Sequence, residues 1–381
     1  MSKLRFHILG PAHIETNRKN SACPFTQKTI RLAEMIKQYG HVVYFYGVEG
    51  SEVVCDEFIE VSTQDILKET YGNSDRTISF FSYDANDRAY QNFTQNAITA
   101  INERKKDKDI LLCPMGVYQK AIADAVNLIA IEPGIGYPGV FANYRIFESY
   151  AWMHYTYGLL KFEDGPWYDA VIPNYYDPND FPFISEKQDY LIYFGRIVSR
   201  KGVQIASDVA KATGNKLYIV GQGSLDNPSE GLSLSKEKHI VYHPAVGPEE
   251  RAKLLGNAKA VLMPTCYFEP FGSVNMEAQF CGTPVITTDW GAFPETVLHG
   301  VTGYRCRTFE EFCWAVNHIS NIKPINCRKW AEENYSMERA AKMYEEYFQR
   351  IHRLYQNGWY ETNDDRNEFK WLERYYPDKS R

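Results

Sequence analysis

The sequence has no long hydrophobic run and no low-complexity tract. Nowhere do about 18 consecutive apolar residues occur, the length that a membrane-spanning helix needs. The opening residues contain no extended apolar segment of the kind found in secretory signal peptides, so we expect a cytoplasmic protein. Hydrophobic residues make up 44% and charged residues 24% of the 381 positions, which excludes a disordered, collagen-like or coiled-coil chain.

An excess of positive charge and paired cysteines are also missing. Lys and Arg total 42 against 48 Asp and Glu, a net charge of −6, which weighs against a nucleic-acid partner without excluding one. Any anion site must therefore be local. The eight cysteines form no C-x-x-C pair, and several, such as Cys113, lie inside apolar runs. We expect buried thiols in a reducing compartment, with no disulfide framework and no zinc site.

Motifs for a dinucleotide or a metal ion are incomplete. Residues Gly134–Gly139 fit the letters G-x-G-x-x-G, but Pro138 interrupts the helix that a dinucleotide site requires. The D-x-D at Asp107–Asp109 lies in a charged segment that is more typical of a solvated turn. His239 and His243 would lie about 13 Å apart on a strand, too far for one ion. We therefore expect no metal site.

Short apolar runs alternate with longer amphipathic ones along the chain, which is typical of an α/β fold. A segment rich in Pro, Asn and Asp at 171–182 indicates a linker between two such series. In the first series we expect strands at 4–9, 41–47, 110–113 and 128–131, helices at 26–39 and 119–126, and an aromatic-rich helical stretch to residue 157. In the second we expect strands at 190–194, 216–220, 239–243, 260–264 and 284–287, and helices from 202, at 248–255 and at 273–281.

This order of elements predicts two doubly wound domains. We expect an N-terminal domain at residues 1–176 and a C-terminal domain at residues 177–335. Residues 336–381 are expected to form C-terminal helices that pack back on the N-terminal domain, with Ser336 as the N-cap of a long helix. Because ligands of such sheets bind beyond the carboxyl ends of the strands, two facing domains predict a cleft.

The most informative segment runs from Glu269 to Glu277. Phe271, Gly272 and Ser273 open a predicted helix after a strand, and the free N–H groups and dipole of its first turn favour an anion. If both glutamates were helical they would lie about 12 Å apart, at ~1.5 Å rise per residue. A glycosidase acid–base pair needs about 5–9.5 Å. The spacing therefore favours two contacts to one elongated ligand over a hydrolytic pair.

Two further predicted strand-to-helix loops carry glycine and positive charge. One predicted strand is followed by Gly195, Arg196 and Lys201. The planar guanidinium of Arg196 and the ammonium of Lys201, five residues later, suit a diphosphate. Gly221 and Gly223 follow the next strand, on the same edge of the predicted sheet. Glycine permits close approach of a ligand to the backbone, so we assign all three glycines to the same anion site.

Together these segments resemble the motifs of retaining, GT-B-fold glycosyltransferases of family 4, the glycosyl transferases group 1. The resemblance covers roughly residues 170–350 in the right order, whereas the first 170 residues match only in pattern. It rests on Glu269–Glu277 as E-x7-E, Phe194–Gly202 as G-R-x4-K-G, Ile219–Gly223 as V-G-x-G, Ile172–Asp177 as P-N-x-x-D, and Trp290–Glu295 with Gly300–Gly303 as the closing G-G-x-P-E and G-x-T-G elements.

The resemblance implies a GT-B fold, in which two Rossmann-like doubly wound domains face each other across a cleft. It implies that the N-terminal domain binds the acceptor and the C-terminal domain the donor. Arg196 and Lys201 match the residues that grip the donor diphosphate. Glu277 matches the residue that holds the ribose hydroxyls, and Glu269 matches the one beside the donor sugar. The backbone of Phe271–Ser273 matches the part that contacts sugar and phosphate.

The implied reaction moves a hexosyl or pentosyl group from a nucleoside diphosphate sugar to an acceptor hydroxyl, with retained anomeric configuration. UDP- and GDP-sugars are the expected donors, with UDP preferred. Positive side chains and a helix N-terminus can stabilise the leaving diphosphate, so no metal ion and no cofactor are expected. The acceptor stays open among a glycan, a lipid-linked sugar, a small molecule and a modified nucleic-acid base, and basic residues at 104–108 leave membrane-surface contact open. The alternatives are a GT-B-fold epimerase or phosphorylase and a non-catalytic sugar-nucleotide-binding module.

The N-terminal half departs from the family pattern. The family places a His at the end of an N-domain strand near the donor sugar, but Glu132 occupies that position here. His154, on the predicted aromatic-rich helix, is the other candidate, so both Glu132 and His154 are kept as candidate catalytic residues. The family's Gly-Gly after the first strand is also missing from the loop Gly10–His13.

Aromatic residues concentrate in one part of the chain. Residues 137–176 contain 13 aromatic residues in 40, whereas aromatics make up 15% of the whole sequence. Many of them suit a core beneath the linker, but flat aromatic faces also suit sugar rings or bases. We expect Tyr137, Tyr144 and Trp152 to line the acceptor site.

Overall fold

The computed structural model describes residues 2–20, 23–73 and 83–355. The chain divides into two compact units. Of the described residues, the first unit contains those up to Glu148, Met153–Tyr175 and 337–355, and the second contains Ser149–Trp152 and Tyr176–Ser336. The last part of the predicted C-terminal helices, residues 356–381, and Ser21 and Ala22 lie outside the described residues.

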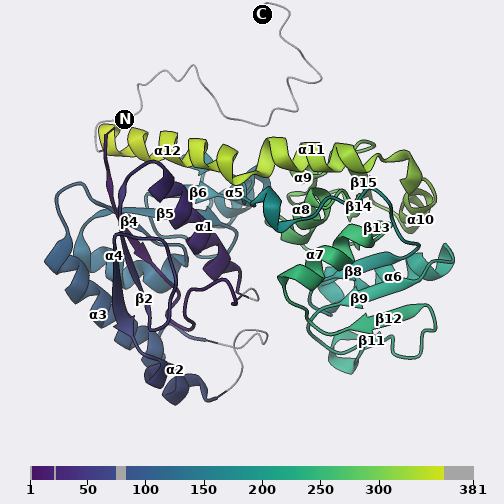
Figure 1. The fold of residues 1–381 in the computed structure, drawn as a ribbon, viewed down its shortest axis with the longest axis horizontal. Coiled ribbons are helices and arrows are strands. Elements are labelled where there is room, and N and C mark those ends of the chain that lie inside the picture. Colours follow the sequence, from purple (N-terminus) through teal and green to yellow (C-terminus); the bar gives the residue numbers. More distant parts are fainter. Residues whose placement is uncertain (1, 21–22, 74–82, 356–381) are drawn as a thin grey trace, which may run out of the picture. The chain divides into compact units, whose positions relative to one another are not determined.

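The first unit is built on a parallel sheet in the order β3-β2-β1-β4-β5-β6-β7 (Figure 1). The chain runs outward from β1 to β3, then returns to the other side of β1 and runs from β4 to β7, so the sheet is doubly wound with a switch point between β1 and β4. The strands are β1 Arg5–Leu9, β2 Val42–Val48, β3 Glu57–Ser62, β4 Ile110–Leu112, β5 Ile129–Ile135, β6 Tyr144–Phe147 and β7 Ala170–Val171. Its helices are α1 Pro24–Gln38, α2 Gln64–Tyr71, α3 Arg88–Arg104, the 3₁₀ turn η1 Gly116–Gln119, α4 Lys120–Val126, α5 Tyr150–Leu160 (whose first residues pack with the second unit) and α12 Met337–Leu354.

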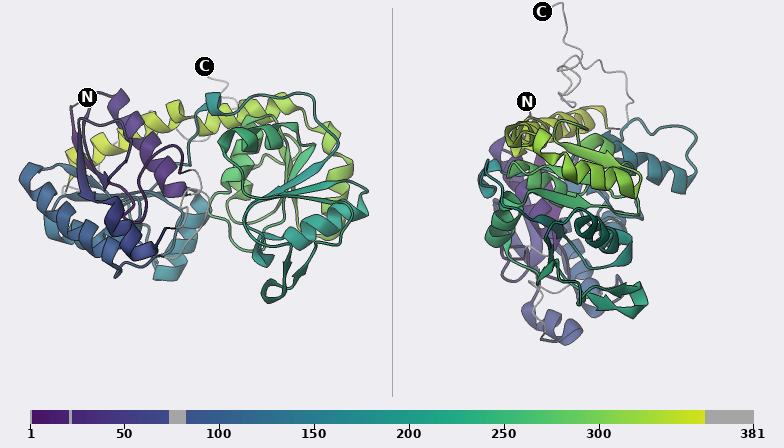
Figure 2. Two further views of the ribbon diagram at one scale, coloured as in Figure 1. Left: turned by 60° about the horizontal axis from the view of Figure 1, so that its bottom comes forward. Right: turned by 90° about the vertical axis from the view of Figure 1, so that its right-hand side faces the viewer.

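The second unit has a six-stranded parallel sheet in the order β12-β9-β8-β13-β14-β15, with its switch point between β8 and β13. Figure 2 shows the strands of this sheet lying between helices. The strands are β8 Leu191–Phe194, β9 Leu217–Val220, β12 Ile240–His243, β13 Ala260–Met263, β14 Val285–Thr288 and β15 Gly303–Cys306, with a small hairpin of β10 Asp226–Asn227 and β11 Leu232–Ser233. The helices are η2 Pro178–Asp180, η3 Ser199–Lys201, α6 Val203–Ala212, η4 Pro228–Glu230, α7 Pro248–Asn257, α8 Ser273–Phe280, α9 Phe293–Thr296, α10 Phe309–Asn317, η5 Ile319–Asn321 and α11 Pro324–Tyr335.

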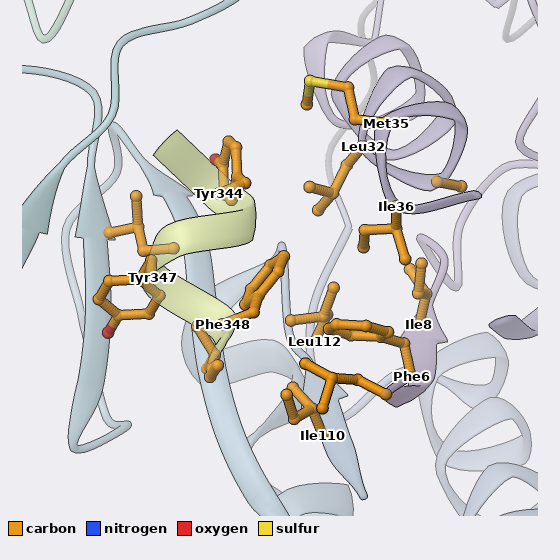
Figure 3. Close-up of a cluster of buried hydrophobic side chains, with 14 of the residues drawn as sticks. Phe6, Ile8, Leu32, Met35, Ile36, Ile110, Leu112, Tyr344, Tyr347 and Phe348 are labelled. Atoms are coloured by element: carbon orange, nitrogen blue, oxygen red, sulfur yellow. The ribbon is translucent and has the colours of Figure 1, made fainter. Parts of the chain in front are cut away.

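Helix α12 completes the core of the first unit. Its apolar residues recur every three or four positions, so one face is buried against α1 and the sheet. Figure 3 shows Phe348 beside Phe6 of β1, and their ring centroids lie 4.9 Å apart. At the same surface the buried His41 Nε2 lies 2.7 Å from a carboxylate oxygen of Glu345. Burying a side chain of this size contributes about 1.5–3 kcal/mol, so α12 is a substantial part of this core.

The two doubly wound α/β domains that the sequence predicts are confirmed, but β3, α2 and α3 were not predicted, and the region around residue 145 differs from the expectation. The aromatic-rich stretch expected to be helical begins with strand β6, and only from Tyr150 onward is it the helix α5. Tyr144 and Arg145 of β6 pair with β5 in parallel register. This strand was not predicted because its four residues are too short for a periodic pattern.

Several motifs that the sequence analysis set aside have structural roles. Asp109, the second residue of the D-x-D, is buried and accepts hydrogen bonds from Arg5 Nε at 3.0 Å, while His7 Nε2 lies 3.0 Å away. Arg104, in the basic segment, contacts Glu57. In the described ranges no group of three or more His, Cys, Asp or Glu side chains could hold a metal ion. No described helix is long and apolar enough to span a membrane.

Candidate functional site

The candidate site of the second unit lies at the switch point of its sheet. Strand β8 leads into the loop of residues 195–202, and its neighbour β13 leads into residues 264–272. The two chain paths turn away in opposite directions after these strands, which leaves room for a ligand beyond their carboxyl ends. The predicted donor residues Arg196, Lys201, Glu269 and Glu277 all follow these two strands or lie on the helix α8 after them.

Lys201 and Glu269 are brought together across 68 residues of sequence. The ammonium of Lys201 donates to Glu269 Oε2 at 2.7 Å, and it lies 4.9 Å from the ring centroid of Tyr267. The Glu269 side chain is nearly buried, so this ion pair is shielded from solvent more than a surface pair. Burial, together with the neighbouring Glu269 carboxylate, raises the pKa of Tyr267 and keeps its phenol neutral. The cluster therefore holds one ammonium, one carboxylate and one hydroxyl in contact.

The backbone of the 195–202 loop is held by close packing. Tyr193 at the end of β8 donates its hydroxyl to the carbonyl oxygen of Arg196 at 2.6 Å, and the Arg196 side chain is exposed. Gly202, with φ of 78°, packs against β13 so tightly that a Cβ atom would lie 2.0 Å from the oxygen of Pro264. Only glycine fits there, because both the left-handed backbone and the contact exclude a side chain.

A second close backbone contact connects the two predicted glycine-rich loops. A Cβ atom on Gly221 would lie 1.9 Å from the carbonyl oxygen of Gly195. The turn that contains Gly223, which is exposed, is therefore packed directly beside the loop that carries Arg196. The structure brings these predicted glycines together at one edge of the sheet.

The N-terminus of α8 carries no capping side chain. Gly272 is the N-cap, with φ of 81°, and no side-chain hydrogen bond satisfies the first turn. Phe271 before it is buried and Ser273 after it is exposed. Because the helix begins at Ser273, Glu269 is not helical, and the spacing of about 12 Å estimated for two helical glutamates does not apply. The left-handed Gly272 turns the chain between the two carboxylates.

One buried carboxylate oxygen of Glu277 has no hydrogen-bond partner among the described residues. Arg251 Nη1 on α7 lies 3.3 Å from Glu277 Oε1, whereas Glu277 Oε2 has no hydrogen bond among the described residues. The side chain is 8% exposed, and a buried carboxylate oxygen without a donor is costly. The Arg251 guanidinium also lies 5.4 Å from the ring centroid of Phe194 at the end of β8. This arrangement suits a ligand that donates hydrogen bonds, such as a diol.

Three residues at this site were not predicted individually. Tyr267 precedes Glu269 by two positions, and a tyrosine so close to the motif is a local signal that could have identified it. The indole Nε1 of Trp290 is buried without a hydrogen-bond partner among the described residues, and the motif beginning at Trp290 marked its neighbourhood. Arg251 had no such signal, because it lies 26 residues before Glu277 on another helix.

The predicted closing element around Glu295 organises the start of α5. Glu295 accepts hydrogen bonds from the backbone nitrogens of Tyr150 at 2.9 Å and Ala151 at 2.7 Å. Ser149 Oγ donates to the oxygen of Pro270 and accepts from the nitrogen of Trp152. The structure thus places Trp152, a predicted acceptor residue, in a buried turn that packs with the second unit.

The predicted catalytic candidates of the first unit have different surroundings. Glu132 is buried in β5, and burial raises the pKa of its carboxyl to about 7. It accepts hydrogen bonds from the backbone nitrogens of Phe141 at 2.9 Å and Ala142 at 2.8 Å. His154 is exposed on α5, with its ring 6.2 Å from that of Tyr157. Glu132 therefore shapes the loop after β5, which gives this buried position a structural role.

A pocket of about 480 Å³ opens in the first unit and includes one of the three predicted acceptor residues. Tyr137 lines it. Tyr144 instead packs in the core of the unit, with its ring 4.9 Å from that of Tyr168. Neither Tyr144 nor Trp152 contributes to the pocket wall.

Comparisons with known proteins relate residues of the second unit to glycosyltransferases. Residues 179–337 match the family model described as glycosyl transferases group 1. An uncharacterized glycosyltransferase of Methanocaldococcus jannaschii is 26% identical over 173 residues, 42% of this chain and 44% of the relative. The glycogen synthase of Mycobacterium tuberculosis strain H37Rv is 32% identical over 151 residues, 36% of each chain. The matched segments thus span less than half the length of these curated relatives.

Solved structures are similar over nearly the whole chain. AviGT4, a glycosyltransferase involved in avilamycin A biosynthesis, has a TM-score of 0.66 at 17% identity, covering 92% of this chain and 98% of its own. HepE of Anabaena in complex with UDP-glucose has a TM-score of 0.62 at 14% identity, covering 91% of this chain and 100% of its own. At such identities the likeness concerns the fold, and the predicted GT-B fold of two Rossmann-like domains is confirmed.

Proposed function

We propose that the protein transfers a sugar from a nucleoside diphosphate sugar to an acceptor hydroxyl, because residues 179–337 match the family model of the glycosyl transferases group 1. The observation that carries the proposal is the pair of carboxylate–cation contacts at one switch point. Lys201 contacts Glu269, and Arg251 contacts Glu277, on either side of an uncapped helix N-terminus. In a donor, a diphosphate lies between a ribose and a sugar. The positive groups suit the diphosphate, and the two carboxylates suit the hydroxyls on either side of it.

The diphosphate is the part of the donor that the positive groups recognise. Arg196 is exposed on the loop after β8 and offers a planar fork of N–H donors, while Lys201 offers a point charge. The N–H groups at the start of α8 add donors and the positive end of the helix dipole. Glu277, with its unpartnered Oε2, accepts from the ribose hydroxyls. The same site therefore binds both ends of a nucleoside diphosphate.

Transfer builds negative charge on the leaving diphosphate as the glycosidic bond breaks. Lys201, Arg196 and the α8 N-terminus stabilise that charge, so the proposed reaction proceeds without a divalent cation. When the diphosphate takes the Lys201 ammonium as a partner, the Glu269 carboxylate is released toward the hydroxyls of the donor sugar. The proposed outcome is retention, with the acceptor attacking on the face from which the diphosphate leaves and a phosphate oxygen taking its proton.

We further propose UDP as the nucleoside diphosphate. The UDP-glucose bound to the Anabaena neighbour supports this choice, because that chain shares the fold over 91% of the present one.

A thermal-shift series with UDP, GDP and ADP, each with and without EDTA, tests donor binding directly. A ligand that binds the native state raises the midpoint of thermal unfolding by mass action. We therefore expect the largest rise with UDP, and the same rise in the presence of EDTA. Transfer is then measured with UDP-sugars and a panel of acceptors. A larger rise in the unfolding midpoint with GDP would show that the donor nucleotide is GDP and not UDP. A rise without turnover of any donor would favour a non-catalytic sugar-nucleotide-binding module.

A further inference from the structure

The pocket of the first unit lies at the switch point of that unit's sheet. Phe25 comes from the path that follows β1, and Met115 and Tyr118 come from the turn that follows β4. Tyr83 and Asp84 reach the same space just before α3. A volume of about 480 Å³ is within the range of small-molecule sites, about 300–1,000 Å³.

One wall of the pocket is a rigid set of aromatic rings. Tyr83 stacks on the buried His13, with ring centroids 4.0 Å apart and planes inclined by 6°. His13 Nδ1 is hydrogen-bonded to the hydroxyl of Tyr90 at 2.8 Å. Tyr118 meets Tyr83 edge to face at 5.4 Å. Stacking, edge contact and a buried hydrogen bond hold these rings in place before a ligand arrives, which lowers the entropy cost of binding.

Tyr137 also lines the pocket, and its hydroxyl contacts the buried Glu132. The Tyr137 hydroxyl lies 3.4 Å from Glu132 Oε1, and its ring lies 6.0 Å from that of Phe25. A Cβ atom on Gly116 would lie 2.3 Å from the Tyr137 ring, so the glycine is required for this ring position. Glu132 therefore acts as a positioning residue for the pocket through Tyr137.

The charge of the pocket is opposite to that of the donor site. Among the ten described residues that line it there is one carboxylate, Asp84, and no Lys, Arg or His. The next cation along the chain, Arg88, is already paired with Glu69 at 2.8 Å. A phosphate group placed here would meet a carboxylate and no positive partner, which is unfavourable.

We propose that this pocket binds a neutral, unphosphorylated sugar ring as the acceptor; this inference rests on the proposed glycosyl transfer. The aromatic rings pack on the apolar C–H face of the sugar, while Asp84 and Asn86 at the rim accept and donate hydrogen bonds to its hydroxyls. A wholly apolar planar ligand would cover the exposed Asp84 carboxylate, which accepts hydrogen bonds from the backbone and side-chain nitrogens of Asn86, without replacing the water that it displaces.

The experiment compares matched neutral and phosphorylated acceptors. Transfer from UDP-sugars is measured with the methyl glycosides of glucose, galactose, mannose and N-acetylglucosamine and with the corresponding sugar 6-phosphates. We expect a neutral sugar to be used at least tenfold more efficiently than its phosphate. Tyr118→Ala should raise the acceptor KM about tenfold or more with the donor KM unchanged, whereas Tyr118→Phe, which keeps the ring, should stay within about threefold of the parent.

Charge reversal and a control outside the pocket complete the test. Asp84→Lys should shift preference toward the sugar 6-phosphate, and Phe58→Ala, which removes an exposed ring from β3, should leave the acceptor KM unchanged. Preference for the phosphates by the parent protein, or an unchanged acceptor KM in Tyr118→Ala while transfer continues, would overturn the pocket assignment and leave the proposed function standing. If no donor is turned over, the proposed function fails by itself. Saturation-transfer NMR with the same methyl glycosides then tests the pocket by itself. Loss of the ligand signal in Tyr118→Ala would support the assignment, and an unchanged signal would contradict it.

Discussion

The two switch points of this molecule share one topology and have opposite chemistry. In the second unit, Lys201 after β8, Arg251 on α7 and the uncapped N-terminus of α8 supply positive charge near this point. In the first unit, the pocket near the ends of β1 and β4 is lined by tyrosines, a phenylalanine and one carboxylate. The doubly wound sheet thus decides where a ligand binds, and the loop side chains decide which ligand it is.

The largest effect is expected in the core of the first unit. Phe348→Ala removes a ring that is 1% exposed and packs on Phe6, and such truncations cost about 3–5 kcal/mol of unfolding free energy. Hydrogen exchange should show lost protection in β1, β4 and α1, while the strands of the second unit keep theirs. An equal loss of protection in both units would show that they unfold as one body.

The next effect concerns the charge of the second switch point. Lys201→Ala should lower transfer about 100- to 1,000-fold, because one donor to the developing diphosphate charge is lost. The matched control is Lys211→Ala, which removes an exposed lysine paired with Glu237 on the same unit. Steady-state kinetics measure both. Parental activity in Lys201→Ala, with the control also unchanged, would contradict the assignment of Lys201 to the diphosphate.

A smaller effect is expected for the ribose contact. Glu277→Gln should weaken UDP binding about 10- to 100-fold, because hydrogen bonds to a charged group contribute about 1.5–3 kcal/mol. Titration calorimetry with UDP and 2′-deoxy-UDP isolates the contact: the deoxy ligand should bind the parent more weakly, with little further loss in Glu277→Gln. The control is Glu250→Gln on the exposed face of α7. If the losses of binding free energy from Glu277→Gln and from removal of the 2′-hydroxyl were fully additive, Glu277 would not contact the ribose.

The smallest effect concerns the buried carboxyl of Glu132. Burial raises the pKa of Glu132 to about 7 from its ordinary value of 4.5, so the folded protein retains this proton where the unfolded chain has lost it. The contribution of Glu132 to stability should therefore fall as the pH rises from about 4.5 to 7 and then level off. Urea unfolding of the parent and Glu132→Gln at pH 5 and pH 8 measures it. A difference between the two proteins that does not change with pH would contradict the raised pKa.

The site of the second unit was largely predictable from the sequence because its signals are local. Gly202 and Gly272 are needed for backbone turns, and each lies within a few residues of a charged group that it positions. The strand before each loop and the helix after it were also visible as apolar periodicity. Strand β6 was not, because a strand of four residues carries too little pattern, and its pairing with β5 is decided by the sheet.

Local patterns in the sequence were enough to predict the two-domain α/β fold, the resemblance of residues 170–350 to glycosyl transferases group 1, and the glycine and charged residues of the loops after β8 and β13, since each depends on neighbours along the chain. Tertiary structure alone decided that Arg251 meets Glu277, that Glu132 holds the loop carrying Tyr137, and that Tyr144 lies in the core while Tyr83 and Tyr118 line a pocket. The physical reason is the separation of the partners. Parallel strands bring residues from distant segments to one edge of a sheet, and no local pattern records which of them will meet there.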